Sequence, residues 1–338
     1  MKCKGMRNTA LFKKALSVRL RIFVVLSFVL ALMPVLTQND YILGILISAN
    51  IYAIFGASWD ILGGVTGIFS LGHALFFGVA AYMSGAMNLI LGLPPLMTIP
   101  MGGAFGVLVG SIVALPSLRL KNEYFAITSL IFPSILAGII IMLPEITGGV
   151  SGLYGLAPIS GDIVVTYYFS LLLMLFSVFI LIKILNSRIG LVFRSIRDDK
   201  ETAEASGINT TKYRFLAFAL SGFFAGIAGG SQAHLLRSIG PFVFDPFNSF
   251  QAIIAAAVGG VGTIFGAIGG SYLMSILNEA LRGIAQFRVL IYALVMLLVF
   301  RYLPGGIIRL LAKRYRISLE TWSGLKKLRR RENDATDS

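Results

Sequence analysis

Long stretches without a charged side chain constrain the fold of this chain more than any other feature of its sequence. Residues 61–118 include no Asp, Glu, Lys or Arg, and three further uncharged stretches cover residues 124–144, 163–182 and 215–233. A helix needs about 20 mostly apolar residues to cross a hydrocarbon layer roughly 30 Å thick. The stretches do not alternate apolar and polar residues as the strands of a membrane β-barrel do. The sequence therefore predicts an all-α, polytopic membrane protein.

The composition and the positions of Gly and Pro extend this prediction to a number of crossings. Charged residues make up 13% of the chain, against about 25% in soluble domains, and the mean hydropathy is +0.84. We expect about ten transmembrane segments, with eight as the alternative. They cover about 21–36, 41–62, 70–91, 98–116, 124–143, 163–185, 213–236, 247–258, 264–281 and 289–300. Segment 247–258 is too short for an upright crossing, so we expect it to enter the membrane partway or to be strongly mismatched.

Basic residues cluster at both ends of the chain, which carries a net charge of +14. Seven precede the first apolar segment and nine follow the last, beside membrane segments rather than in a soluble domain, so contact with lipid and not nucleic acid is expected. The positive-inside rule places both termini in the cytoplasm. The predicted organisation is a basic arm at 1–20, a single transmembrane domain at 21–305 and a basic tail at 306–338. The segment 187–212 is a cytoplasmic part of that domain.

Ten charged residues lie between Arg188 and Arg214, in a segment that must therefore lie in water. Asp198 followed by Glu201 resembles a capping box, and Gly207 can adopt the left-handed conformation that ends a helix. The pattern predicts a helix of about eight residues over 198–207, followed by a cap at Asn209 or Thr210. So short a helix is not stable alone in water. It must pack either on a partner protein or on its own chain, and spacing alone leaves both open.

Two glycine-rich stretches resemble each other, GGVTGIFSLG from Gly63 and GGVGTIFGAIG from Gly259. Transporters often contain internal repeats whose interrupted helices lie beside the substrate path. The alternative is that these glycines let helices pack closely. The candidates for the translocation path are Gly63, Gly64, Gly67, Ser70, Gly72, His73, Gly259, Gly260 and Gly262.

The remaining polar residues give no sign of catalysis or metal binding. His73 and His234 are the only histidines, and an isolated histidine in a membrane is more often packed than a ligand. Asp60, Asp245 and Glu279 fall near segment ends, whereas an ion-coupled carrier is expected to place carboxylates at mid-depth. The sequence contains neither H-E-x-x-H nor G-x-S-x-G. It also lacks the G-x-x-x-x-G-K-[ST] loop, so an enzyme is not expected and ATP is not expected to bind to this chain.

The order of motifs resembles a known family along residues 40–305. GLVFRSIRDDKETAEASGINTTKYRFLAFALSGFFAGIAGG from Gly190 is similar to the corresponding run in permease subunits of branched-chain amino-acid ABC transporters. SLGHALFFGVAAY from Ser70, LRLKNEYFAITSL from Leu118 and VGGVGTIFGAIGG from Val258 also fit that family. Thr147, Gly148 and Gly149 match its outside loop, although Val150 and Ser151 depart from the Ser or Thr and Asp that many relatives have next.

The resemblance implies an importer subunit in a prokaryotic cytoplasmic (inner) membrane. Its expected partners are two cytoplasmic ATPase subunits that hold ATP and Mg²⁺, a second related permease and an extracytoplasmic solute-binding protein, with a hetero-pair of permeases favoured over a homodimer. Branched-chain or other small neutral amino acids are the expected solutes, urea or short amides the alternative, and an ion-coupled carrier the competing class. The implied ATPase-coupling residues are Arg194, Arg197, Asp198, Glu201, Ala203, Glu204 and Gly207. Thr147, Gly148 and Gly149 are implied to contact the binding protein.

Overall fold

The computed structural model describes residues 27–37, 39–114, 122–302 and 306, and these are mostly helical. The basic arm 1–20, nearly all of the basic tail, and the turn with Arg119 and Lys121 lie outside the described residues. The first half comprises Ser27–Leu36, α2 Asp40–Trp59, the π-helix η1 Asp60–Val65, α3 Ala74–Leu91, α4 Pro95–Ala114, α5 Asn122–Met142, α6 Pro144–Thr147 and β1 Leu153–Tyr154. The second half comprises α7 Ile163–Leu185, α8 Arg188–Asp198, α9 Lys200–Ala205, α10 Thr210–Leu236, β2 Ser238–Ile239, η3 Pro241–Phe244, α11 Pro246–Gly259, α12 Ile264–Ala280, η4 Arg282–Phe287 and α13 Arg288–Tyr302.

Six of the described helices are long and apolar enough to cross a membrane: α2 with η1, α3, α4, α5, α7 and α10. The pair α11 and α12 bends by 116° at the glycine-rich break and raises the number to seven if it forms one span. Ser27–Leu36 and the apolar part of α13 are shorter than a full crossing. The membrane class is therefore confirmed, whereas the number ten and the orientation of the termini stay predictions.

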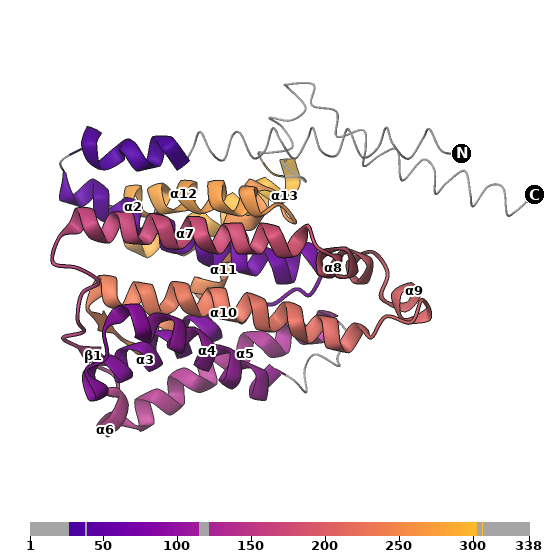
Figure 1. Cartoon of the computed structure of the whole chain (residues 1–338), viewed down its shortest axis with the longest axis horizontal. Coiled ribbons are helices and arrows are strands. Elements are labelled where there is room, and N and C mark those ends of the chain that lie inside the picture. Colours follow the sequence, from indigo (N-terminus) through magenta and orange to yellow (C-terminus); the bar gives the residue numbers. More distant parts are fainter. Residues whose placement is uncertain (1–26, 38, 115–121, 303–305, 307–338) are drawn as a thin grey trace, which may run out of the picture.

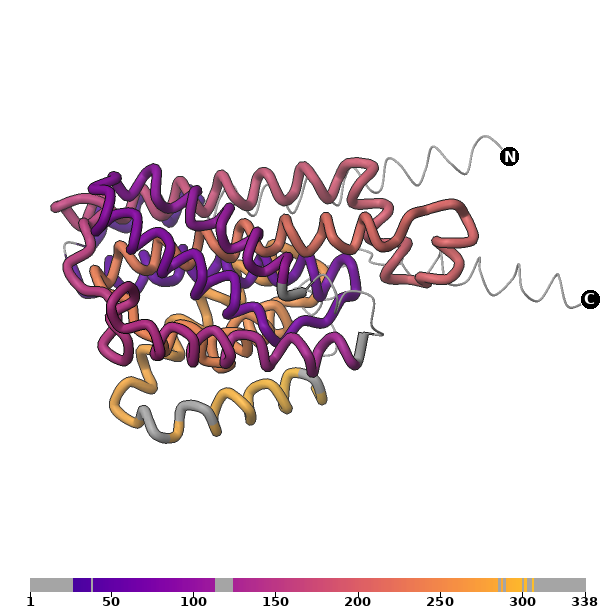
Figure 2. The backbone as a smooth tube through the Cα atoms, turned by 90° about the horizontal axis from the view of Figure 1, so that it is seen from below, coloured from indigo at the N-terminus to yellow at the C-terminus, as the bar shows by residue number. Residues whose placement is uncertain are grey.

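The helices lie side by side in a bundle, and the charged segment projects at one end of it. Figures 1 and 2 both place α8 and α9 beyond the ends of α7 and α10, while α6 and β1 lie at the opposite end. We call these the α8 end and the β1 end. The strands β1 and β2 pair antiparallel, with Leu153 opposite Ile239. This pairing joins the loop before α7 to the chain that leaves α10.

Small residues hold α3, α4 and α10 in close contact. A Cβ built at Gly229 in α10 would lie 2.0 Å from the carbonyl oxygen of Phe77, and one built at Gly102 in α4 would lie 2.6 Å from that of Ala80. Within lipid, close backbone approach and van der Waals packing drive helix association, because burial of apolar surface from water does not. The glycines of these helices are therefore packing positions.

A buried polar chain joins α2 to α7 and α12. The amide nitrogen of Asn50 donates a hydrogen bond of 3.0 Å to the Ser170 hydroxyl, and the Tyr272 hydroxyl donates to the amide oxygen of Asn50. Asn50 is fully buried and Ser170 nearly so. Because a buried polar group without a partner is costly, these bonds fix the rotation of three helices relative to one another.

Candidate functional site

The charged segment folds as two short helices where the sequence predicts one. Asp198 ends α8, and Asp199 adopts an extended backbone conformation with φ −162° and ψ 111°. The carboxylate of Asp199, not of Asp198, caps α9 by accepting hydrogen bonds from the backbone nitrogen and the hydroxyl of Thr202. The predicted start was therefore wrong by one residue, because two adjacent aspartates carry the same capping signal and only the extended residue can use it.

The predicted end of this helix and the cap of the next one are confirmed. Gly207 has φ +82°, and its N–H donates to the carbonyl of Glu204 while Ile208 donates to that of Ala203. This is a Schellman motif, which favours glycine at the left-handed position. The side chain of Asn209 then accepts from the backbone nitrogen of Lys212 and caps α10.

Most of α9 faces water, and its carboxylates differ in their contacts. Ala203 is buried, whereas Glu201, Glu204 and Gly207 are exposed. Glu204 accepts a hydrogen bond from the Thr210 hydroxyl and lies 3.6 Å from the ammonium group of Lys200. The hydrogen bond from Thr210 holds the pKa of Glu204 below its usual value and so favours the ionised carboxylate.

The preceding helix, α8, rests on the bundle by one face, which sequence reasoning missed. Phe193 and Ile196 are buried there, with Gly190 on the same face. A guanidinium nitrogen of Arg194 lies 3.5 Å from the carbonyl oxygen of Leu185 at the end of α7. The amphipathic spacing at positions 190, 193 and 196 was the available signal. The segment thus packs partly on its own chain.

Arg197 and Asp60 bring the two glycine-rich breaks together. Nη1 of Arg197 donates a 2.8 Å hydrogen bond to the carbonyl of Gly64. Oδ1 of Asp60 accepts a 2.6 Å bond from the backbone nitrogen of Gly262. We call Asp60, Gly64, Arg197 and Gly262 the glycine junction. It joins α8 to both stretches that resemble each other in sequence, at the α8 end of the bundle.

The other path candidates near these breaks touch protein atoms. A Cβ at Gly63 would lie 2.6 Å from the Trp59 ring, one at Gly67 would lie 2.7 Å from Cγ of Arg197, and one at Gly72 would lie 1.9 Å from the carbonyl of Ser129. Gly259 likewise meets Gly266, and Gly260 has φ +122°. In this conformation the glycines permit close contact, while a path role stays a prediction.

His73 and Ser70 lie in the core just before α3. Nε2 of His73 is 2.8 Å from the Ser58 hydroxyl, and its ring stacks on Phe55 with centroids 5.0 Å apart. The carbonyl of Ser70 accepts a bond of 2.8 Å from the indole nitrogen of Trp59. Both residues are almost fully buried. Their contacts pin the chain between η1 and α3 against α2.

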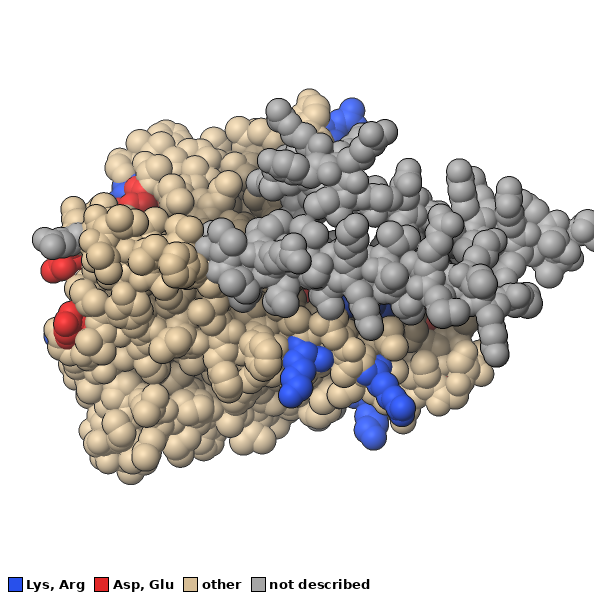
Figure 3. Space-filling view, turned by 45° about the horizontal axis from the view of Figure 1, so that its top comes forward, with Lys and Arg blue, Asp and Glu red and all other residues tan. Residues whose placement is uncertain are grey.

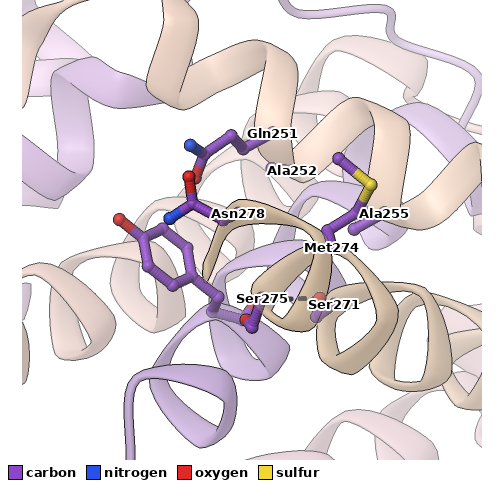
Figure 4. A pocket seen from close by; sticks show the side chains of 8 residues that line it. Gln251, Ala252, Ala255, Ser271, Met274, Ser275 and Asn278 are labelled. Carbon is purple, nitrogen blue, oxygen red and sulfur yellow. Dashed lines mark hydrogen bonds between the residues drawn. The ribbon is translucent and has the colours of Figure 1, made fainter. Parts of the chain in front are cut away.

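A small polar cleft lies between α2, α11 and α12. Uncharged polar side chains line it together with alanines and one methionine, and Figure 4 shows the amide groups of Gln251 and Asn278 close to each other. The lining residues are Tyr52, Gln251, Ala252, Ala255, Ser271, Met274, Ser275 and Asn278. Its space suits water, whereas a solute pocket measures roughly 300–1,000 Å³. The second cavity, beside Ser70 and Gly72, is smaller still.

At the β1 end, Thr147, Gly148 and Gly149 form a tight turn. The Thr147 hydroxyl lies 2.6 Å from the carbonyl of Ile140 and accepts from the backbone nitrogen of Gly149. Gly148 and Gly149 have φ of +74° and +59°, where residues with a side chain are strained. The structure thus places the three predicted loop residues together on one turn.

His234 holds the loop between α6 and α7 against the bundle. Its Nδ1 lies 2.8 Å from the carbonyl of Ala157, which can only accept, so Nδ1 is assigned the proton. Nε2 then accepts from the Thr98 hydroxyl in α4 at 2.9 Å. The Ser84 hydroxyl in α3 lies 3.0 Å from the same nitrogen and donates to the Thr98 hydroxyl. Asn88 accepts from the nitrogen of Ala157 at 2.8 Å. His234 is therefore a packed, hydrogen-bonded residue.

We expect His234→Leu to loosen this loop, because it removes these bonds and leaves buried partners unsatisfied. The free energy of unfolding should fall by about 1–3 kcal/mol. Thermal unfolding of the detergent-purified protein and limited proteolysis between residues 148 and 162 would measure both effects. An unchanged cleavage pattern would show that the β1–β2 pairing alone holds the loop.

Charged side chains gather at the two ends of the described bundle. Figure 3 shows a broad face without charge, acidic groups at the β1 end, and most of the visible basic groups toward the end where α8 begins. The described basic residues at the α8 end include Lys183, Arg188, Arg194, Arg197, Lys200, Lys212 and Arg214. The described acidic residues at the β1 end include Asp40, Glu145 and Asp162, and the basic residue Arg237 lies beside β1 at the same end.

Asp60 was the functional candidate that sequence reasoning missed. Its position near the end of an expected segment suggests no role, yet it is fully buried and contacts a residue 202 positions away. A carboxylate three residues before a glycine pair, inside an apolar segment, was the available signal. Such a group is costly in a membrane unless it is paired.

Comparison with known proteins gives a consistent set of relatives. A family model described as "Branched-chain amino acid transport system / permease component" matches residues 41–300. The chain is 25% identical to the high-affinity branched-chain amino acid transport system permease protein LivM of Escherichia coli, over 86% of this chain and 76% of that protein. It is 25% identical to the probable branched-chain amino acid transport permease protein LivH of Methanocaldococcus jannaschii, over 84% and 94%. It is also 25% identical to the fructose import permease protein FrcC of Rhizobium meliloti, over 74% and 70%. No solved structure matches the chain.

Proposed function

Because the chain belongs to the family of branched-chain amino acid transport system permease components, we propose that it is the permease subunit of an ATP-driven importer in a prokaryotic cytoplasmic membrane. The observation that carries this proposal is the α8–α9 segment. It projects at one end of the apolar bundle, rests on it by the buried face of α8 and presents the mostly exposed α9 outward. Such a segment can bind a soluble partner through α9 and transmit the partner's movement to the bundle through α8.

The expected partners are two ATPase subunits at the α8 end, which hold ATP and Mg²⁺. Ionised Glu204 and exposed Glu201 and Asp198 offer carboxylates to basic groups of an ATPase. The basic side chains at the α8 end support a cytoplasmic position of this end by the positive-inside rule. Movement of the ATPases would then pass through α8 and α9 to α7 and α10. The turn at Thr147, Gly148 and Gly149 would face a solute-binding protein on the other side.

A second, related permease is proposed to complete the path. Within the described residues, neither of the two cavities described above has room for an amino acid. Similarity to proteins named both LivM and LivH supports a pair of different permeases over a homodimer. The path would open between the two subunits as the ATPases close and separate.

Small neutral amino acids, branched-chain ones above all, are the proposed solutes. Two relatives named for branched-chain amino acids support this solute class. The relative named a fructose import permease makes sugars the competing solute class. Urea or short amides remain the alternative within the same family.

Uptake by the purified assembly in vesicles tests this proposal. We expect uptake of labelled leucine when ATP is on the side of the membrane that carries the ATPases and the binding protein is on the other side. Unlabelled valine should compete with this uptake, whereas urea and fructose should not. Uptake driven by an ion gradient through the chain alone would instead establish a secondary carrier. Competition by urea or fructose but not by valine would support the importer function and contradict the proposed solute class.

A further inference from the structure

We propose that Arg197 and Asp60 are positioning residues that transmit movement of the α8–α9 segment to both glycine-rich breaks at once. This inference rests on the proposed function, which supplies the force on α8. It assigns the glycine junction the task of converting that force into a joint displacement of two membrane-embedded breaks.

Arg197 provides the first link, from α8 to the break after α2. It lies in the last turn of α8, and its Nη1 donates to the carbonyl of Gly64, inside the π-helix η1. The aliphatic part of the same side chain covers Gly67, where a Cβ would lie 2.7 Å from Cγ. Displacement of α8 must therefore either carry this break along or break a charge-assisted hydrogen bond.

Asp60 provides the second link, from that break to the one before α12. Its Oδ1 accepts from the nitrogen of Gly262, and the guanidinium group of Arg197 lies beside the same glycine. The other oxygen, Oδ2, accepts no hydrogen bond from the described part of the chain. The carboxylate is fully buried, so it depends on these two neighbours for stabilisation.

The junction has no free space in which one break could move alone. A Cβ at Gly64 would lie 2.0 Å from Oδ1 of Asp60 and 2.5 Å from the nitrogen of Gly262. A Cβ at Gly262 would lie 3.1 Å from Nη1 of Arg197 and from the carbonyl of Gly64. Close-packed contacts transmit displacement and tend to switch between discrete arrangements. A π-helix at such a place is typical of functional sites.

The test uses Arg197→Gln, Arg197→Lys and Asp60→Asn in the full assembly. Matched controls are Arg188→Gln, an exposed arginine in the first turn of α8, and Asp40→Asn, an exposed carboxylate in the first turn of α2. ATP hydrolysis and solute uptake are measured in the same vesicles. Amide hydrogen exchange is measured separately on each purified chain, at residues 61–67 and 259–263.

We expect Arg197→Gln to lower uptake per ATP hydrolysed by about tenfold or more, the size of one lost charge-assisted hydrogen bond. Arg197→Lys should recover part of this ratio because it keeps the charge. Asp60→Asn should fall between them, since its amide oxygen can still accept from Gly262. Exchange should rise at both breaks in Arg197→Gln and at neither in the controls.

Unchanged uptake per ATP in Arg197→Gln and Asp60→Asn, or faster exchange at residues 61–67 alone, would overturn the proposal. Exchange decides the linkage even without transport. If both breaks respond together while the unaltered assembly shows no ATP-driven uptake, the junction is supported and the importer function fails. If the unaltered assembly transports and only one break responds, the function stands and the junction fails.

Discussion

Glu204→Lys combined with Gly207→Pro is expected to reduce ATP-driven uptake to background while leaving membrane insertion intact. Proline holds φ near −65°, whereas Gly207 has φ +82° and donates its N–H to Glu204. The substitution therefore removes the Schellman end of α9. Lysine at position 204 loses the bond from Thr210 and repels Lys200, which now lies 3.6 Å from the carboxylate.

Insertion should survive because α7 and α10, the apolar helices on either side, are untouched. Uptake into vesicles and the amount of protein in the membrane fraction measure the two effects separately. Asp40→Lys reverses a charge on an exposed residue at the β1 end and serves as the control. Normal ATP-driven uptake by the double variant would contradict the coupling role of α9.

Gly229→Ala is expected to destabilise the packing of α10 on α3. The new Cβ would lie 2.0 Å from the carbonyl oxygen of Phe77, so α10 and α3 would have to separate. Overpacking of this kind costs roughly 1–3 kcal/mol. Alanine is the better helix former by about 1 kcal/mol, which does not offset the clash.

Gly44→Ala is the matched control, because Gly44 lies in the second turn of the membrane helix α2 and a Cβ there meets nothing within 4 Å. It should leave the thermal unfolding midpoint unchanged or raise it. The midpoint and the monodispersity of detergent-purified protein are the measurements. Equal midpoints for the two variants would show that α3 and α10 can separate without loss.

Much of the fold could be predicted because membrane insertion depends on local composition. A stretch of about 20 apolar residues must satisfy its backbone hydrogen bonds as a helix in lipid, whatever it packs against. The shorter pieces could not be counted in this way. The 116° bend between α11 and α12 and the short helix Ser27–Leu36 leave the number of crossings open to packing.

In the candidate site, too, the features set by local sequence could be predicted, and those set by packing could not. Gly207 and Asn209 were assigned from neighbouring residues alone, since a helix end is determined within one turn. The cap predicted at Asp198 was wrong and lies at Asp199, because either aspartate can cap a helix and the backbone conformation of Asp199 decides between them. Spacing alone leaves open whether the charged segment packs on a partner protein or on its own chain. The buried residues Phe193 and Ile196 of α8 show that it packs partly on its own chain.

The sequence by itself determined that this chain is a membrane protein and that a charged segment outside the membrane separates two spans. It also determined the residue at which the last helix of that segment ends. Each follows from residues within about 20 positions of one another. Only the tertiary structure decided that Asp60, Arg197 and Gly262 meet, across separations of 133 to 202 residues between bonded partners. No local pattern encodes that meeting, because it arises from how the helices pack around two glycine-rich breaks.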